Sequence, residues 1–313
     1  NLRANRSVLA AALLLAAGAA VVLSPVSIAQ DRAPGPDQRT QADDRPAIGG
    51  HDVPRHDVGA AIGADLERQR RPISSREVTY EIDGRTYRGY LAMPEALPEN
   101  ETRPGVLVVH EWWGRNDYAM FRADMLAELG FVAFAADMYG SAQVVTSPGR
   151  AQNLATPFYT DRSLMVRRAQ AGLDQLTGLA AVDADQLAAI GYCFGGTVAL
   201  ELARAGADLD AVVSFHGGLA SPNSFKDAGF DGTVMVANGA ADEMVPTNER
   251  NAFIADAEDA GIDYLFIEHG GAVHSFTNPA ADELDMNSVG YDQHADRRSW
   301  RHMLLLFEET LTD

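Results

Sequence analysis

From residue 104 to residue 311, the sequence alternates short apolar runs with segments of helical periodicity. Short apolar runs bounded by turn residues are typical of strands that are buried on both faces of a parallel sheet. Because helical segments separate the runs, the pattern predicts an α/β fold with a mostly parallel central sheet and helices on both faces. The expected strands are "PGVLVVH" (104–110), "FVAFAAD" (131–137), "QLAAIGY" (186–192), "DAVVSFHG" (210–217), "GTVMVANG" (232–239) and "DYLFIEHG" (263–270).

The spacing of apolar residues places the covering helices between these strands. A hairpin is expected before the first buried strand, because "REVTYEIDGRTYRGYLAMP" (76–94) predicts two strands around Asp83 and Gly84. The long polar stretch 140–160 carries no predicted element. Ligands of parallel sheets bind at the carboxyl ends of the strands, so candidate chemical groups should directly follow strands. The expected helices cover 116–130, 161–178, 194–205, 247–260 and 294–311.

The first residues have the order of a secretory signal. Two arginines precede an apolar run over 8–23, and Ser27 and Ala29 supply small residues before Gln30. This order predicts cleavage after Ala29 and export to the periplasm or the medium, with no stable membrane association afterwards. An uncleaved membrane anchor is the alternative, although the run is shorter than the roughly 20 residues that a span needs.

Composition divides the remaining chain into two parts. Residues 30–75 are rich in Asp, Arg, Pro, Gly and Gln and show little apolar periodicity, which is typical of a linker or a mobile arm. The pattern changes at about residue 76. We therefore expect a signal peptide over 1–29, an N-terminal arm over 30–75 and one α/β domain over 76–313.

Charge and cysteine content exclude several classes of partner. The formal net charge is −19, which repels phosphate backbones and argues against nucleic acid as a partner. One cysteine allows no intramolecular disulfide. The sequence has no HExxH motif, no cysteine pair and no phosphate-binding glycine loop, so neither a metal nor a cofactor is expected. The oligomeric state stays open.

The only cysteine lies in "GYCFGG", between a predicted strand and a predicted helix. Gly191 and Gly195 flank Cys193 at two positions on either side, which is the nucleophile-elbow pattern with cysteine in place of serine. The glycines let the strand and helix backbones approach closely, and the helix N-terminus stabilises a thiolate. The N–H of Phe194 would then face a developing oxyanion. A buried structural thiol is the alternative interpretation.

Two further residues follow strands in the order that this architecture requires, which is nucleophile, acid and base. Asp242 lies in "MVANGAADEMVP" and His274 in "FIEHGGAVHSF". His274 can take the thiol proton, and Asp242 can orient its imidazole. The alternatives are a turn carboxylate and a solvated loop histidine.

The segment "VLVVHEWWGRNDY" contributes the remaining candidates. Glu111 would stand near the thiol, or else be a solvated acid at a strand end, and the N–H of Trp112 is the candidate for the second oxyanion donor. An apolar substrate pocket is expected from the aromatic side chains, with His216 as a further lining residue, although each could equally be core. These aromatic candidates are Trp113, Tyr139 and Phe276.

With these motifs placed, the chain resembles the dienelactone hydrolase family of the α/β-hydrolase superfamily over about residues 75–311. The segments that carry the resemblance are "HEWWGRNDY", "ADMYG", "GYCFGG", "NGAADEMVP" and "GAVHSFTNP". The resemblance implies a triad of Cys193, His274 and Asp242, with Glu111 contacting the cysteine at rest. It also implies substrate contacts at Arg150 and at Asn278, which stands where the family has an arginine.

The sequence thus predicts an exported carboxylic ester hydrolase that acts on small esters or lactones through a thioester at Cys193. Because Asn278 stands where the family has an arginine, the resemblance argues against dienelactone as the substrate. Two alternatives stay open. One is a peptidase or another acyl hydrolase on the same scaffold, and the other is a non-catalytic member that binds small molecules.

Overall fold

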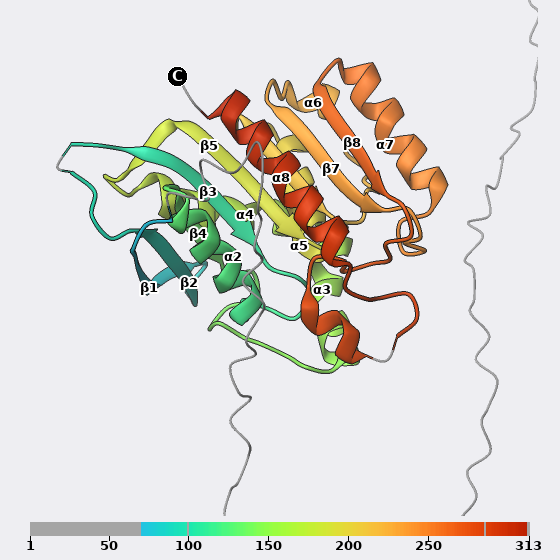
Figure 1. Cartoon of the computed structure of the whole chain (residues 1–313), viewed down its shortest axis with the longest axis horizontal. Coiled ribbons are helices and arrows are strands. Elements are labelled where there is room, and N and C mark those ends of the chain that lie inside the picture. The colour runs from blue at the N-terminus through green and yellow to red at the C-terminus, as the bar shows by residue number, and fades with distance from the viewer. Residues whose placement is uncertain (1–69, 99, 285, 312–313) are drawn as a thin grey trace, which may run out of the picture. The chain divides into compact units, whose positions relative to one another are not determined.

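The computed structural model describes residues 70–98, 100–284 and 286–311 (Figure 1). The signal peptide and most of the arm that the sequence predicts lie outside these residues. An eight-stranded sheet runs in the order β1-β2-β4-β3-β5-β6-β7-β8, with antiparallel pairing of β1 with β2 and of β2 with β4, and parallel pairing elsewhere. The strands are β1 (Ile73–Ile82), β2 (Arg85–Pro94), β3 (Arg103–Val109), β4 (Val132–Ala136), β5 (Val182–Tyr192), β6 (Ala211–Phe215), β7 (Thr233–Gly239) and β8 (Asp263–His269).

Helices cover both faces of this sheet, which confirms the predicted α/β fold. Helices α2 and α8 bury apolar side chains on one face, and α8 crosses that face in Figure 1. The other face packs against α3, α4, α5, α6 and α7. The helices are α2 (Asp117–Glu128), α3 (Pro148–Thr160), α4 (Arg162–Thr177), α5 (Phe194–Arg204), α6 (Phe225–Ala228), α7 (Thr247–Ala260) and α8 (Gln293–Thr310), with a 3₁₀ turn η1 (Pro279–Leu284).

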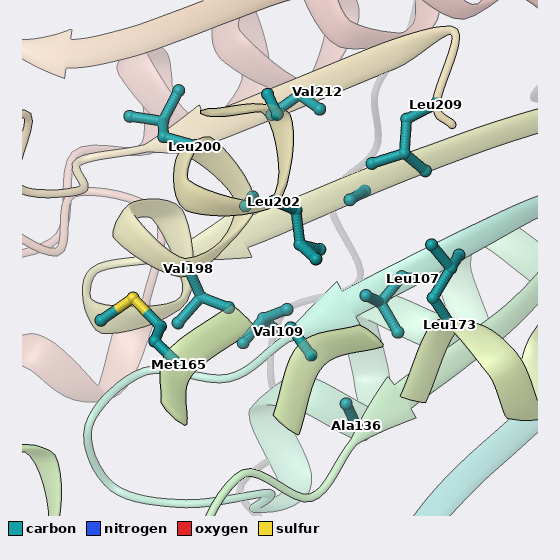
Figure 2. Packing of buried hydrophobic residues seen from close by; sticks show 14 of the residues in the cluster. Leu107, Val109, Ala136, Met165, Leu173, Val198, Leu200, Leu202, Leu209 and Val212 are labelled. Atoms are coloured by element: carbon teal, nitrogen blue, oxygen red, sulfur yellow. The ribbon is translucent and has the colours of Figure 1, made fainter. Parts of the chain in front are cut away.

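The strands at the centre of the sheet have no solvent-facing side. All five residues of β4 and all five of β6 are buried, which explains their continuous apolar sequences. Figure 2 shows Leu107 and Val109 of β3 packed with Leu173 of α4 and Val198 of α5. Because this packing holds the ends of the strands in place, the loops that follow them start from fixed positions.

Side-chain caps fix where several helices begin. The carboxylate of Asp161 accepts the N–H of Leu164 at 3.0 Å at the start of α4. Asn116 caps α2 and Asp292 caps α8 in the same way. Each cap satisfies an N–H group that has no partner within its helix. The cap at Asn116 fixes where α2 begins, and thus where the loop after β3, residues 110–116, ends.

Helix α3 and the start of β1 differ from the sequence expectations. The polar stretch 140–160 contains α3, which was not expected because Pro148, Gly149 and Pro157 obscure its pattern. Pro148 is at the first turn, where a missing N–H costs nothing. Strand β1 begins at Ile73, so three residues assigned to the arm belong to the sheet. Among the helices in the described ranges, none is long and apolar enough to cross a membrane.

Candidate active site

The turn between β5 and α5 holds Cys193 in a strained conformation. Its backbone has φ 53° and ψ −114°, a combination that costs a non-glycine residue on the order of 1–3 kcal/mol. A Cβ atom at Gly191 would lie 1.9 Å from the carbonyl oxygen of Gly195, and a Cβ at Gly195 would lie 2.2 Å from that of Val109. Both glycines are therefore required by close backbone approach. The turn lifts a free, half-buried thiol above the sheet.

His274 joins Cys193 to Asp242. The imidazole Nδ1 lies 2.8 Å from Oδ2 of Asp242, and the ring is close enough to the Cys193 sulfur for the two to interact electrostatically. The other carboxylate oxygen of Asp242 accepts the N–H of Met244 at 2.8 Å. Burial opposes a charge on His274, but the sulfur of Cys193 and the carboxylate of Asp242 outweigh it and raise the pKa of His274 well above its ordinary value. The structure thus brings the three expected residues together.

Glu111 lies beside this group in a fully buried position. Its carboxylate accepts hydrogen bonds from the Ser275 hydroxyl at 3.0 Å and from the Asn278 amide at 2.6 Å. Burial raises the pKa of Glu111, although these two donors oppose the rise. The amide oxygen of Asn278 accepts the N–H of Ala280 at 3.0 Å. Asn278, expected to contact substrate, thus has protein partners for both ends of its amide, and Ser275 is a partner that the sequence did not indicate.

His216 was expected to line the pocket, but it is completely buried under the elbow. Its Nδ1 accepts the backbone N–H of Cys193 at 3.1 Å, and its Nε2 lies 2.7 Å from the Thr277 hydroxyl. That hydroxyl lies 2.7 Å from the Tyr118 hydroxyl, which accepts from Arg122 at 3.2 Å. A chain of hydrogen bonds therefore supports the backbone of the nucleophile turn from below.

Phe276 was also expected in the pocket. Its ring is completely buried and lies 5.2 Å, between ring centroids, from both His216 and His269. Phe276 is therefore a core residue of the histidine loop, which is the loop after β8 that carries His274. Sequence could not separate this role from pocket lining, because an aromatic residue in "HSFTN" fits both.

Aromatic side chains surround Phe194, the first residue of α5. Tyr139, Phe158 and Tyr159 all contact the ring of Phe194, with centroid distances of 5.4–5.9 Å. Tyr159 is 44% exposed, although it packs on Phe194. Sequence reasoning missed it because it belongs to α3. Of the remaining pocket candidates, Trp113 is buried against Val145 and Ala151, and Arg150 is exposed on α3.

Two backbone N–H groups, those of Trp112 and Phe194, were expected to bind an oxyanion. Phe194 is the first residue of α5, so its N–H has no acceptor within the helix. Trp112 follows Glu111 in the loop after β3. Among the hydrogen bonds between described residues, neither N–H has an acceptor. Paired free donors of this kind can stabilise a negative oxygen, and the same residues include no group of three side chains placed to hold a metal ion.

A mostly parallel sheet with an elbow after β5, a carboxylate after β7 and a histidine after β8 defines the α/β-hydrolase class. The groups lie at the carboxyl ends of the strands, as expected for this kind of sheet. Within that class, the chain belongs to the dienelactone hydrolase family, whose sequence profile matches residues 87–311. The family expected from the sequence is confirmed, and membership supports the expected class of carboxylic ester hydrolase.

Known relatives extend over most of the described part of the chain. The structure of a dienelactone hydrolase-like promiscuous phosphotriesterase from metagenomic libraries is 41% identical, with a TM-score of 0.73, and the match covers 77% of this chain and 99% of that one. The structure named m3DLH is 39% identical with the same TM-score and the same coverage. Protein usf of Aquifex pyrophilus is 28% identical over 240 residues, which are 75% of this chain and 98% of that protein.

Proposed function

We propose that this protein hydrolyses small carboxylic esters or lactones by transferring the acyl group to Cys193. The observation that carries the proposal is the hydrogen bond between His274 and the buried Asp242, together with the electrostatic interaction of the same imidazole with the Cys193 sulfur. A thiol at the start of a helix, next to an imidazole oriented by a buried carboxylate, is an activated nucleophile.

In the first step, the Cys193 sulfur, whose proton His274 already holds, attacks the substrate carbonyl as a thiolate. A C–S bond forms while the π electrons of the carbonyl move onto oxygen. The N–H groups of Trp112 and Phe194 stabilise this oxyanion, and each such donor is worth about 3–4 kcal/mol in studied enzymes. When the intermediate collapses, the C–O bond to the alcohol breaks and the alcohol leaves with the proton from His274, so a thioester remains.

In the second step, water replaces the alcohol. His274 takes a proton from the water, whose oxygen attacks the thioester carbonyl, and the same two N–H groups hold the oxyanion. The C–S bond then breaks, the acid leaves, and the sulfur returns to its starting state beside the imidazolium of His274. Asp242 stabilises the charged ring throughout both steps.

Esters and lactones are favoured over amides as substrates. In the tetrahedral adduct of an amide, the thiolate is a better leaving group than the amine, so the adduct returns to the starting amide. An ester adduct loses its alcohol more readily. Hydrolysis of esters and lactones is therefore favoured, and hydrolysis of peptides is the weaker alternative.

Phosphotriesters are a second candidate substrate class. The support is the 41% identity to a structure described as a promiscuous phosphotriesterase. A phosphoryl oxygen can accept from the same pair of N–H groups as a carbonyl oxygen.

We also propose that the protein is exported and that residues 1–29 are removed. The support is the order of charged, apolar and small residues at the N-terminus.

The test compares the protein with its Cys193→Ala variant on short p-nitrophenyl esters, a panel of lactones, an aryl phosphotriester and a matched p-nitroanilide. The proposal requires ester or lactone turnover that Cys193→Ala abolishes, and a much lower rate on the anilide. Full activity of Cys193→Ala would discard the nucleophile. Equal rates on ester and anilide would instead favour a peptidase.

A further inference from the structure

The loop after β3 supplies one of the two N–H groups of the proposed oxyanion hole, and a buried histidine controls how that loop is oriented. His110 directly follows β3 and is completely buried. Its Nε2 lies 3.3 Å from the backbone N–H of Met138, which follows β4. Because an N–H can only donate, Nε2 must be the acceptor, and the single ring proton of the neutral imidazole is on Nδ1.

This tautomer makes Nδ1 a donor, and its acceptor is the carbonyl oxygen of Glu111. The N–H of Gly114 donates to the same carbonyl at 3.2 Å. Burial lowers the pKa of His110 to about 4, so the ring stays neutral over the ordinary working range of pH. Two donors, Nδ1 of His110 and the N–H of Gly114, therefore hold the Glu111 carbonyl in an orientation that points toward His110.

The orientation of that carbonyl fixes the next N–H. No cis peptide bond occurs among the described residues. In a trans peptide the C=O and the following N–H point in opposite directions. Since the Glu111 carbonyl points toward His110, the Trp112 N–H of the same peptide unit points away from His110.

The next peptide unit is held as well. The Tyr139 hydroxyl donates to the carbonyl oxygen of Trp112 at 3.0 Å. Tyr139 packs edge-on against His110 at 4.9 Å between ring centroids, and both rings contact Phe194, at 6.0 Å for His110 and 5.8 Å for Tyr139. Phe194 supplies the other free N–H. One aromatic cluster therefore spans both donors.

We propose that His110 is a positioning residue, which aims the Trp112 N–H at the carbonyl oxygen of the substrate by holding the Glu111 carbonyl. Tyr139 assists from the following peptide. This role rests on the proposed function, because it concerns the oxyanion of that reaction. His110 is completely buried, and the partners of its ring among the described residues are the Glu111 carbonyl, the Met138 N–H and the rings of Tyr139 and Phe194, so its effect should be confined to steps in which charge develops on oxygen.

The experiment uses His110→Phe, which keeps an aromatic ring but removes both nitrogens. His110→Asn keeps a donor near the position of Nδ1, and Tyr139→Phe removes only the hydroxyl. His302→Phe, a change at a partly buried histidine on α8, is the matched control. Each protein is assayed for kcat and KM on p-nitrophenyl butyrate and for the rate at which iodoacetamide alkylates Cys193. Alkylation is a displacement at carbon that generates no oxyanion.

We expect His110→Phe to lower kcat at least about tenfold, since loss of a whole oxyanion donor costs about 10²–10³. The KM and the alkylation rate of His110→Phe should stay within about twofold of those of the unmodified protein, because only the interaction with the oxyanion changes. His110→Asn should recover most of kcat, because it keeps a donor to the Glu111 carbonyl. Tyr139→Phe should show a smaller loss of the same kind, and His302→Phe none.

An unchanged kcat in His110→Phe would overturn the positioning role, as would a fall in the alkylation rate that matches the fall in kcat. If His110→Phe does not fold, Tyr139→Phe and His110→Asn decide the question. A kcat for Tyr139→Phe equal to that of the unmodified protein would contradict the positioning role. So would a kcat for His110→Asn as low as that expected for His110→Phe. Failure of the proposed function has a different signature, which is ester turnover that persists in Cys193→Ala.

Discussion

The backbone N–H of Cys193 donates to Nδ1 of His216 at 3.1 Å. This contact requires a neutral His216, because a protonated Nδ1 would present a second donor to the N–H. Burial, followed by the charges of His274 and Arg122, lowers the pKa of His216 well below its ordinary value. The same N–H also donates to the Phe215 carbonyl at 3.0 Å, so a neutral His216 shares it with the backbone of β6.

The first prediction concerns acid stability. In the unfolded chain His216 binds a proton near pH 6.5, but in the folded protein it does not, so the unfolded state holds more protons and stability falls as pH drops below about 6.5. His216→Gln keeps an acceptor and cannot titrate. We expect its unfolding free energy to fall less steeply below pH 6.5, by up to about 1.4 kcal/mol per pH unit. Urea unfolding between pH 7.5 and 5 measures this slope.

His294→Gln is the matched control for that measurement, since His294 is an exposed histidine on α8. It should leave the slope as it is in the unmodified protein. A slope in His216→Gln equal to that of the unmodified protein would contradict the assignment of His216 as a buried neutral imidazole.

The second prediction concerns Asp242. Its carboxylate orients Nδ1 of His274 and stabilises the charged ring. Asp242→Asn should lower kcat on esters about 10³–10⁴-fold, as the corresponding change does in serine hydrolases. Glu243→Gln removes the same charge from the neighbouring exposed residue and should change kcat less than about twofold, because an exposed charge is screened. Similar losses in both variants would show that net charge matters and orientation does not.

The third prediction concerns Glu111, whose pKa burial raises. A carboxyl with a raised folded pKa contributes its full stability below its unfolded pKa and loses it as pH rises through the folded value. Glu111→Gln removes this charge, and its amide can still pair with Ser275 and Asn278. Above the raised pKa, the variant should be more stable than the unmodified protein, by about 1.4 kcal/mol for each unit of the shift. The advantage should vanish on acidification.

Thermal unfolding from pH 8 to pH 4 measures this difference, with Glu95→Gln as an exposed control. If Glu111→Gln is less stable than the unmodified protein at pH 8, the two hydrogen bonds of Glu111 outweigh its burial and the prediction is wrong.

The fourth prediction concerns the elbow glycines. A methyl group at Gly195 would collide with the carbonyl oxygens of Val109 and His110, at 2.2 and 2.7 Å. Gly195→Ala should therefore cost about 2–4 kcal/mol of stability and displace α5 from the strand ends. Gly149→Ala, in α3 with nothing within 4 Å of the added atom, should be neutral or slightly stabilising. Chemical denaturation of the two variants and the unmodified protein gives the comparison, and equal stabilities would contradict the close approach.

Much of this arrangement follows from the sequence because buried parallel strands have a distinctive apolar pattern. The positions of Cys193, Asp242 and His274 after three such strands were enough to expect them at one edge of the sheet. Helix α7 was expected over 247–260 and is observed as Thr247–Ala260. Where the periodicity was interrupted by proline and glycine, as in α3, the prediction failed.

The supporting contacts could not be predicted, since they depend on side chains that meet across the fold. His110 looked like the last residue of a strand, and its partner Met138 is 28 positions away. In the histidine loop, Ser275 has φ 57°, so simple alternation does not describe which side chains point inward. Phe276 and His216 were therefore assigned to the pocket, although both lie in the interior. The polar residues that follow His274 in the sequence were the available signal for Ser275 and Thr277.

Cys193 is the only sulfhydryl of the chain. If peroxide oxidises it to a sulfenic acid, the molecule holds no second cysteine to trap that state as an internal disulfide. Rescue then depends on a small thiol from solution, and without one further oxidation to the sulfinic acid is irreversible for most proteins. The half-buried setting of this atom thus governs how readily peroxide reaches the sulfur and how long the free thiol survives.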